Sequence, residues 1–175
     1  MSILYVSLIA LVVSVLDRLT KSAAEISLSS LDTLAVIPGI FHLTLVHNTG
    51  AAFGLLRGGS VVLVAITFLC VAAIFLFLKV PRFLKVFFGL DHVDAGLCLA
   101  FGLILGGAVG NLIDRLQFSY VIDFLDFRIW PVFNVADSAI TVGAGILFLK
   151  MLFSKNGRTQ YRSQNGGVSH GAGPL

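Results

Sequence analysis

Residues 95–113 read AGLCLAFGLILGGAVGNLI, an apolar stretch without a charged side chain. A helix rises about 1.5 Å per residue and a bilayer core is about 30 Å thick, so about 20 such residues cross it. Gly102, Gly106 and Gly110 recur at four-residue steps, the spacing that lets membrane helices approach closely. The stretch therefore predicts a membrane helix with a small-residue packing seam.

The composition extends this prediction to the whole chain. Of the 175 residues, 57% are apolar and 12% are charged, which is too apolar a balance for a small soluble domain. Further apolar stretches predict spanning helices at 3–22, 60–79 and 132–153. The basic residues are scattered singly, so we expect no nucleic-acid partner. The expected fold class is an all-α membrane protein with four transmembrane helices.

Two segments between these helices have strand-like patterns. Residues 39–47 alternate in part between turn residues, and residues 120–130 are rich in β-branched and aromatic side chains. Both segments emerge at the same end of the helices, so we expect a small extracytoplasmic β element at one membrane face. The tail, 154–175, is rich in Gly, Ser, Gln and Asn and is predicted to be disordered and cytoplasmic. This leaves 1–153 as a single four-helix domain.

The distribution of charge predicts the orientation. Four spans put both termini on one side, and that side holds the larger group of basic residues, Lys79, Arg82, Lys85, Lys150, Lys155, Arg158 and Arg162, whereas the other side holds Arg18, Lys21, Arg57, Arg115 and Arg128. Because cytoplasmic loops are enriched in Lys and Arg, we expect cytoplasmic termini. Most acidic residues, including Asp32 but not Asp91 and Asp94, lie on the other side, so acid chemistry should face outward.

Polar residues occur at helical spacing in or next to three of the spans. The three sets are Asp17, Thr20 and Lys21; Asn111, Asp114 and Arg115; and Asn134, Asp137, Ser138 and Thr141. An ionisable side chain in a membrane helix costs roughly 2.5–3.5 kcal/mol, so such sets usually face a bundle interior or a wet cavity. Pairing of an acid with a base, as between Asp17 and Lys21 at i, i+4, would explain the first two sets structurally. Direct participation in a site explains them equally well.

Asp123 and Asp137 lack an obvious local counter-ion. Asp137 lies in an apolar helix, which favours a function, whereas Asp123 alone could be a solvated loop acid. Two carboxylates in a dry site share one proton, and such a pair can hydrolyse a peptide bond through an activated water. Which aspartate is the acid and which the base stays open. No HExxH or GxSxG motif occurs, His42 and His47 suit surface or interface positions, and we expect no metal and no cofactor.

These polar sets belong to five strings in a fixed order. They are Asp17-Arg-Leu-Thr-Lys21, Asn48-Thr-Gly-Ala-Ala-Phe53, Gly110-Asn-Leu-Ile-Asp-Arg115, Val121-Ile-Asp-Phe124 and Phe133-Asn-Val-Ala-Asp-Ser-Ala-Ile140. In this order, on a four-helix frame, they resemble the motifs of the lipoprotein signal peptidases, also called signal peptidase II. The resemblance extends to about residue 153. Arg18 stands where Gln is more usual in the family.

The resemblance implies an inner-membrane aspartic endopeptidase of bacteria. It would cleave the signal peptide from diacylglyceryl-modified prolipoproteins, just before the lipid-bearing cysteine, with membrane lipid around it and with an extracytoplasmic β-cradle. The implied roles are Asp123 and Asp137 as the catalytic pair, Asn48, Asn111, Arg115 and Asn134 as substrate-binding or site-ordering residues, and Asp17, Lys21 and Asp114 as supporting residues.

Two other classes of membrane protein share some of these sequence features. A small transporter or proton channel would also keep Asp, Asn and Arg in its bundle, but its acids should lie near the midplane and within repeated halves. A helix-packing subunit would need the glycine seam but neither Asp123 nor Asp137. The sequence shows acids clustered at one face and no repeat, which favours the peptidase. A monomer is the expected state.

Overall fold

The computed structural model describes residues 2–31, 33–50, 60–88 and 92–165. Its elements, in chain order, are α1 (Ser2–Leu28), β1 (Thr33–Ile37), β2 (Phe41–Asn48), α2 (Ser60–Lys79), α3 (Pro81–Phe88), α4 (Ala95–Phe118), β3 (Val121–Asp126) and α5 (Val135–Asn165). Asp32, residues 51–53 of the second sequence motif, Arg57, Asp91 and the tail residues 166–175 lie outside the described residues.

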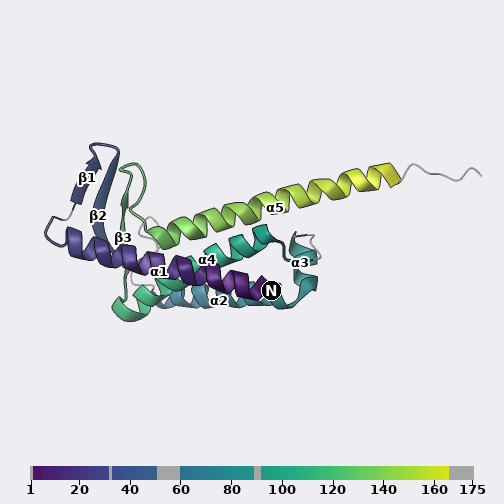
Figure 1. Ribbon diagram of the computed structural model, residues 1–175, viewed down its shortest axis with the longest axis horizontal. Coiled ribbons are helices and arrows are strands. Elements are labelled where there is room, and N and C mark those ends of the chain that lie inside the picture. Colours follow the sequence, from purple (N-terminus) through teal and green to yellow (C-terminus); the bar gives the residue numbers. More distant parts are fainter. Residues whose placement is uncertain (1, 32, 51–59, 89–91, 166–175) are drawn as a thin grey trace, which may run out of the picture.

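Within the described residues, four helices are long and apolar enough to cross a membrane. The spanning segments are Ser2–Leu28, Val61–Lys79, Ala95–Phe118 and Val135–Phe153. The helices run between one end that carries the strands and an opposite end that carries α3, and the start of α1 lies at the α3 end (Figure 1). With the three-stranded sheet, this arrangement confirms the predicted fold class.

Helix α4 is the centre of the bundle, because 67% of its span is buried in the protein against 6% for α2. The predicted glycine seam is present, and its partner is α1: Gly102 meets Ile9, Gly106 meets Ala10 and Gly110 meets Asp17. A Cβ atom at Gly106 would lie 2.7 Å from the carbonyl oxygen of Ala10. The small residues therefore let the backbones of α1 and α4 approach to a distance that larger side chains would prevent.

The opposite face of α4 positions the start of α5. A Cβ atom at Gly107 would lie 2.3 Å from the carbonyl oxygen of Ala136 and 2.8 Å from the Ile140 side chain. Ala136 is fully buried and immediately precedes Asp137. The missing side chain at Gly107 therefore fixes where Asp137 can lie.

The sheet is antiparallel, in the order β1-β2-β3. Strand β3 follows α4 after a left-handed residue, Ser119 (φ 65°), whose N–H donates to the Arg115 carbonyl. The sheet packs on the last turns of α1, where Ala24 and Leu28 contact Phe124. This apolar contact explains why α1 continues to Leu28 instead of ending near the predicted residue 22.

Other boundaries also differ from the sequence expectation for local reasons. Helix α5 begins at Val135 instead of 132, because the N–H and carbonyl of Phe133 bond to Leu125 in a bridge beside β3. Helix α4 continues past 113 to Phe118, and the link predicted at 80–94 contains α3. Helix α5 extends to Asn165 and so includes the first part of the tail, whose disorder stays a prediction.

Exchanging single glycines tests the close packing of α4 on α5. We expect Gly107→Ala to destabilise the protein by about 1–3 kcal/mol, because its methyl group would overlap the Ala136 carbonyl. Gly145→Ala on the exposed side of α5 is the matched control, because no atom of the described residues lies within 4 Å of its Cβ position and alanine favours a helix by about 1 kcal/mol. Unfolding by SDS in mixed micelles measures both. Equal stability of the two variants would contradict this account of the packing.

Candidate active site

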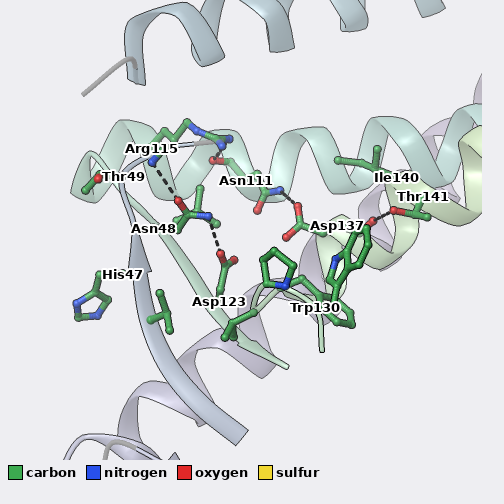
Figure 2. A pocket seen from close by; sticks show the side chains of 16 residues that line it. His47, Asn48, Thr49, Asn111, Arg115, Asp123, Trp130, Asp137, Ile140 and Thr141 are labelled. Carbon is green, nitrogen blue, oxygen red and sulfur yellow. Dashed lines mark hydrogen bonds between the residues drawn. The ribbon is translucent and has the colours of Figure 1, made fainter. Parts of the chain in front are cut away.

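A polar cavity of about 510 Å³ opens at the end of the bundle that carries the sheet. It is lined from β2, α4, β3, the segment 130–133 and α5. Figure 2 shows the carboxylates of Asp123 and Asp137 directed into this space from different elements, with Asn48, Asn111 and Arg115 around them. The two aspartates singled out in the sequence therefore face one cavity, together with Asn48, Asn111 and Arg115. Asn134, the fourth residue expected to bind substrate or order the site, is fully buried and contacts both carboxylates from behind the cavity wall.

Asp123 is placed by the register of the sheet. It pairs with Val46 on β2, and Asn48 lies two residues further along the same strand. Side chains two residues apart on a strand share a face, so Asn48 reaches diagonally to Asp123. The Asn48 Nδ2 donates to Asp123 Oδ2 over 2.8 Å. The prediction that the 39–47 segment is strand-like thus accounts for how the second motif reaches the site.

Asp137 is placed by the N-terminal cap of α5. The Asn134 side-chain oxygen accepts from the Asp137 N–H at 2.9 Å, and the Asp137 Oδ2 accepts from the Asn134 N–H at 3.3 Å. This reciprocal arrangement is a capping box, with Asn134 as the cap and Asp137 three positions later. Local helix chemistry therefore fixes the Asp137 carboxylate at the rim of the cavity.

Two amides connect the carboxylates. Asn134 Nδ2 donates to Asp123 Oδ1 at 2.6 Å, so one asparagine touches both aspartates. Asn111 Nδ2 donates to Asp137 Oδ1 at 2.8 Å, and Asn111 Oδ1 accepts from Asn134 at 3.1 Å. Among the described residues, each carboxylate thus accepts two hydrogen bonds: Asp123 from the Asn48 and Asn134 side chains, and Asp137 from the Asn111 side chain and the Asn134 N–H.

A buried ammonium group lies behind the amides. Lys21 is 0% exposed, and its Nζ lies 2.7 Å from Asp17 Oδ2, 2.8 Å from Asp114 Oδ2 and 3.0 Å from Asn111 Oδ1. The three donors of a lysine ammonium are therefore all used. The predicted Asp17–Lys21 pair is confirmed, and Asp114 joins it from α4. Because Lys21 holds the Asn111 oxygen, the Asn111 amide nitrogen must face Asp137.

Asp17 and Asp114 also hold the backbone next to Asp123 and Asp137. Asp114 Oδ2 accepts from the N–H of Ile122, which precedes Asp123, at 3.2 Å. Asp17 Oδ1 accepts from the N–H of Ala136, which precedes Asp137, at 2.9 Å. Spacing within each helix could not reveal these links, because they join segments far apart in the sequence. The only sequence signal was that the three polar sets lie at one membrane level.

The surroundings of Asp123 change its protonation. Burial of its carboxyl, and next the negative charge of Asp137, raise the pKa of Asp123 to about 7. Hydrogen bonds from Asn48 and Asn134 act in the opposite direction, because they favour the ionised form. At neutral pH the cavity therefore holds a carboxyl group that can still carry a proton.

The structure adds lining residues that the sequence did not single out. His47 lines the cavity and packs against Tyr120, with ring centroids 4.4 Å apart. Trp130 forms one wall together with Thr141 (Figure 2). Arg115, which the sequence analysis did single out, lines the same cavity from α4, where its Nη1 lies 3.4 Å from the Asn111 carbonyl oxygen. Their common signal in the sequence was closeness to the motif residues.

Fold and cavity together define a class of protein: a membrane-embedded enzyme of four helices with two carboxylates in a polar cavity at one end. The family profile described as "Signal peptidase (SPase) II" matches residues 9–153. The chain belongs to the signal peptidase II family, which is a family of aspartic peptidases.

Relatives and solved structures agree with this assignment. The chain is 48% identical over 145 residues to the lipoprotein signal peptidase of Moorella thermoacetica, covering 83% of this chain and 91% of the relative. It is 40% identical over 144 residues to that of Halothermothrix orenii, covering 82% and 92%. A solved structure described as a bacterial membrane enzyme matches with a TM-score of 0.71 and 30% identity, over 85% of this chain and 87% of the other. The protein is a multi-pass bacterial membrane enzyme.

Replacing the buried cation tests the support of the site. We expect Lys21→Met to destabilise the protein by roughly 3–5 kcal/mol, because Asp17 and Asp114 would remain buried without their shared counter-ion. Arg18→Gln is the matched control: it also removes a cation that contacts Asp114, but one whose side chain is 37% exposed, so at most about 1 kcal/mol should be lost. SDS unfolding measures both. A Lys21→Met protein as stable as Arg18→Gln would show that the network is not needed for folding.

Proposed function

We propose that this protein is an aspartic endopeptidase that removes the signal peptide of diacylglyceryl-modified prolipoproteins, cleaving just before the lipidated cysteine. The observation that carries the proposal is the placement of Asp123 and Asp137 in one cavity, bridged by Asn134. Family membership supports the substrate class, because the relatives are lipoprotein signal peptidases. Residues 1–153 would form the peptidase domain.

A second cavity supports a substrate that carries acyl chains. This apolar groove of about 480 Å³ lies beside the polar one and shares Trp130, Phe133, Asp137 and Thr141 with it. Its remaining lining includes the apolar side chains of Phe127, Ile129 and Val142. A lipidated cysteine next to a scissile peptide bond needs this combination, because its acyl chains avoid water while the reaction consumes water. The groove could hold the acyl chains while the peptide lies over the carboxylates.

The environments of the two aspartates suggest their roles. Asp123 is 1% exposed and keeps its proton to about pH 7, whereas Asp137 lies at the start of α5, where the helix dipole and two hydrogen bonds stabilise a carboxylate. We therefore assign the proton to Asp123 and the negative charge to Asp137.

The reaction then proceeds in two steps, each with two proton transfers. Asp137 takes a proton from water, whose oxygen attacks the scissile carbonyl carbon, while Asp123 gives its proton to the carbonyl oxygen. In the second step Asp137 returns its proton to the leaving nitrogen, Asp123 regains a proton from the hydroxyl group, and the carbon–nitrogen bond breaks. Both carboxyl groups end in their starting states, and no metal is required. Asn48, Asn111, Arg115 and Asn134 would hold the carboxyl groups and the substrate in place.

The orientation also remains a proposal. The basic residues Lys79, Arg82 and Lys85 lie at the end of the bundle opposite the cavity. The excess of such residues in cytoplasmic segments supports cytoplasmic termini and an extracytoplasmic active site. The monomeric state and the lack of a nucleic-acid partner stay predictions from the sequence.

Substitution of each aspartate tests the proposed dyad. We expect Asp123→Asn and Asp137→Asn each to lower kcat on a diacylglyceryl-modified prolipoprotein peptide by at least about 10³-fold, with little additional loss in the double variant, because the two groups act as a unit. A gel-shift cleavage assay measures the activity of each variant, and unfolding by SDS shows whether it is folded. Asp126→Asn is the control, because Asp126 lies on the same strand but binds Thr44 and Arg128. A transporter or packing subunit would show no wild-type cleavage, and retained cleavage by either dyad variant would refute the mechanism.

The dependence of activity on pH tests the assigned roles. As pH rises through about 7, Asp123 loses its proton and can no longer protonate the carbonyl oxygen, so kcat/KM should fall. Asn48→Ala removes a hydrogen bond that lowers the pKa of Asp123, so it should move this fall to higher pH. Thr44→Val, which removes the bond to Asp126 on the same sheet, should leave the profile unmoved. A fall that stays in place in Asn48→Ala, or moves to lower pH, would refute the assignment.

A further inference from the structure

Helix α3 lies across the end of the bundle opposite the active site (Figure 1). The spanning segment of α2 ends at Lys79, and that of α4 begins at Ala95. Residues 81–88 therefore lie where the hydrocarbon core gives way to lipid headgroups. Neither the catalytic proposal nor the family assignment gives this helix a role.

One face of α3 anchors it to the bundle. Leu84 is only 2% exposed and belongs to the same buried cluster as Ile74 and Phe101. The Phe87 ring meets the Phe77 ring of α2 edge-on, with centroids 5.5 Å apart. These contacts fix the rotation of the helix, and therefore which of its side chains point away from the protein.

The outward side of α3 has an apolar stripe and a basic stripe. Phe83, Val86 and Phe87 follow the i, i+3, i+4 spacing of one helix face and are 37%, 71% and 53% exposed. Arg82, four residues before Val86, borders this stripe and is also exposed, and Lys79 precedes it at the end of α2. This separation of exposed apolar and basic side chains is typical of helices that lie in a membrane interface.

The charge of this patch favours an anionic partner. Asp94, the acidic residue that precedes α4, already accepts hydrogen bonds from the Leu97 N–H and from Lys150. Its two oxygens are therefore occupied by donors other than Arg82 and Lys79. Basic residues next to membrane helices are attracted to anionic lipid headgroups, and the exposed apolar stripe requires an acyl phase at the same place. A phospholipid supplies both.

We propose that α3 is an interfacial helix that binds the headgroups of anionic phospholipids through Arg82 and Lys79 while Val86 and the exposed edge of Phe87 face the acyl region. The proposed lipid site lies at the end of the bundle opposite the candidate active site, so it does not depend on the proposed peptidase function. Lys85 extends the basic face of the same helix.

Lipid titration of the purified, delipidated full chain tests the headgroup site. Native mass spectrometry would compare phosphatidylglycerol with phosphatidylcholine of the same acyl chains. We expect tighter binding of phosphatidylglycerol by the wild type and a Kd raised about fivefold in Arg82→Gln and again in Lys79→Gln, the loss expected for one charge near a lipid surface. Arg128→Gln, an exposed arginine at the sheet end, should keep the wild-type Kd. Equal Kd values for the two lipids, or an unchanged Kd in Arg82→Gln, would overturn the proposal.

The depth of α3 gives an independent measurement. A nitroxide label at Val86→Cys, with Cys70 and Cys98 changed to Ala, would be placed in vesicles of phosphatidylcholine and phosphatidylglycerol. We expect collisions with oxygen, which concentrates in the acyl region, to exceed those with a water-soluble nickel chelate. Greater access to the chelate would place Val86 in water and overturn the proposal.

Discussion

The contacts of one buried ammonium group determine the arrangement of the site. Lys21 has no exposed surface, and its nitrogen is shared among Asp17, Asp114 and Asn111. A lone charge in this position would be very costly, so the helices that carry its partners must meet at this point. The glycine seam allows that approach, because Gly110 lies directly against Asp17. Packing and electrostatics therefore specify the same register of α1 on α4.

The same group links the two halves of the candidate site. Each acid that binds Lys21 also accepts a backbone hydrogen bond next to Asp123 or Asp137. Asp114 uses the same oxygen, Oδ2, for Lys21 and for the Ile122 N–H. Asp17 binds Lys21 through Oδ2 and the Ala136 N–H through Oδ1. The sheet and α5 are thus attached to one cation by two chains of hydrogen bonds. A shift of either element would break a bond to a buried charge, which costs more than breaking a bond at the surface. This explains why strands outside the membrane helices can hold Asp123 in a defined place relative to Asp137.

The sequence predicted features that depend on local spacing. Apolar length predicted the four spans, four-residue glycine steps predicted a packing seam on α4, and the i, i+4 spacing of Asp17 and Lys21 predicted their ion pair. Features that depend on contacts between distant parts of the chain could not be predicted from the sequence. The continuation of α1 to Leu28 requires the sheet above it, and the start of α5 requires the bridge from Phe133 to Leu125. Helix α3 is short, and its formation depends on the packing of Leu84 in the buried cluster, which the local sequence does not reveal.

The amide layer of Asn111 and Asn134 explains how a site can be held by charges and still keep a proton. If Lys21 contacted a dyad carboxylate directly, their attraction in a dry interior would favour the ionised form of that carboxylate. Instead, Lys21 contacts the Asn111 oxygen. The uncharged Asn111 amide is oriented by this contact, and its nitrogen donates a hydrogen bond to Asp137. Lys21 is only the last of the influences on the pKa of Asp123, after burial, Asp137 and the two amides. The charged network can therefore be strongly paired while, in the proposed mechanism, the carboxylates in front of it exchange protons with the water and the substrate.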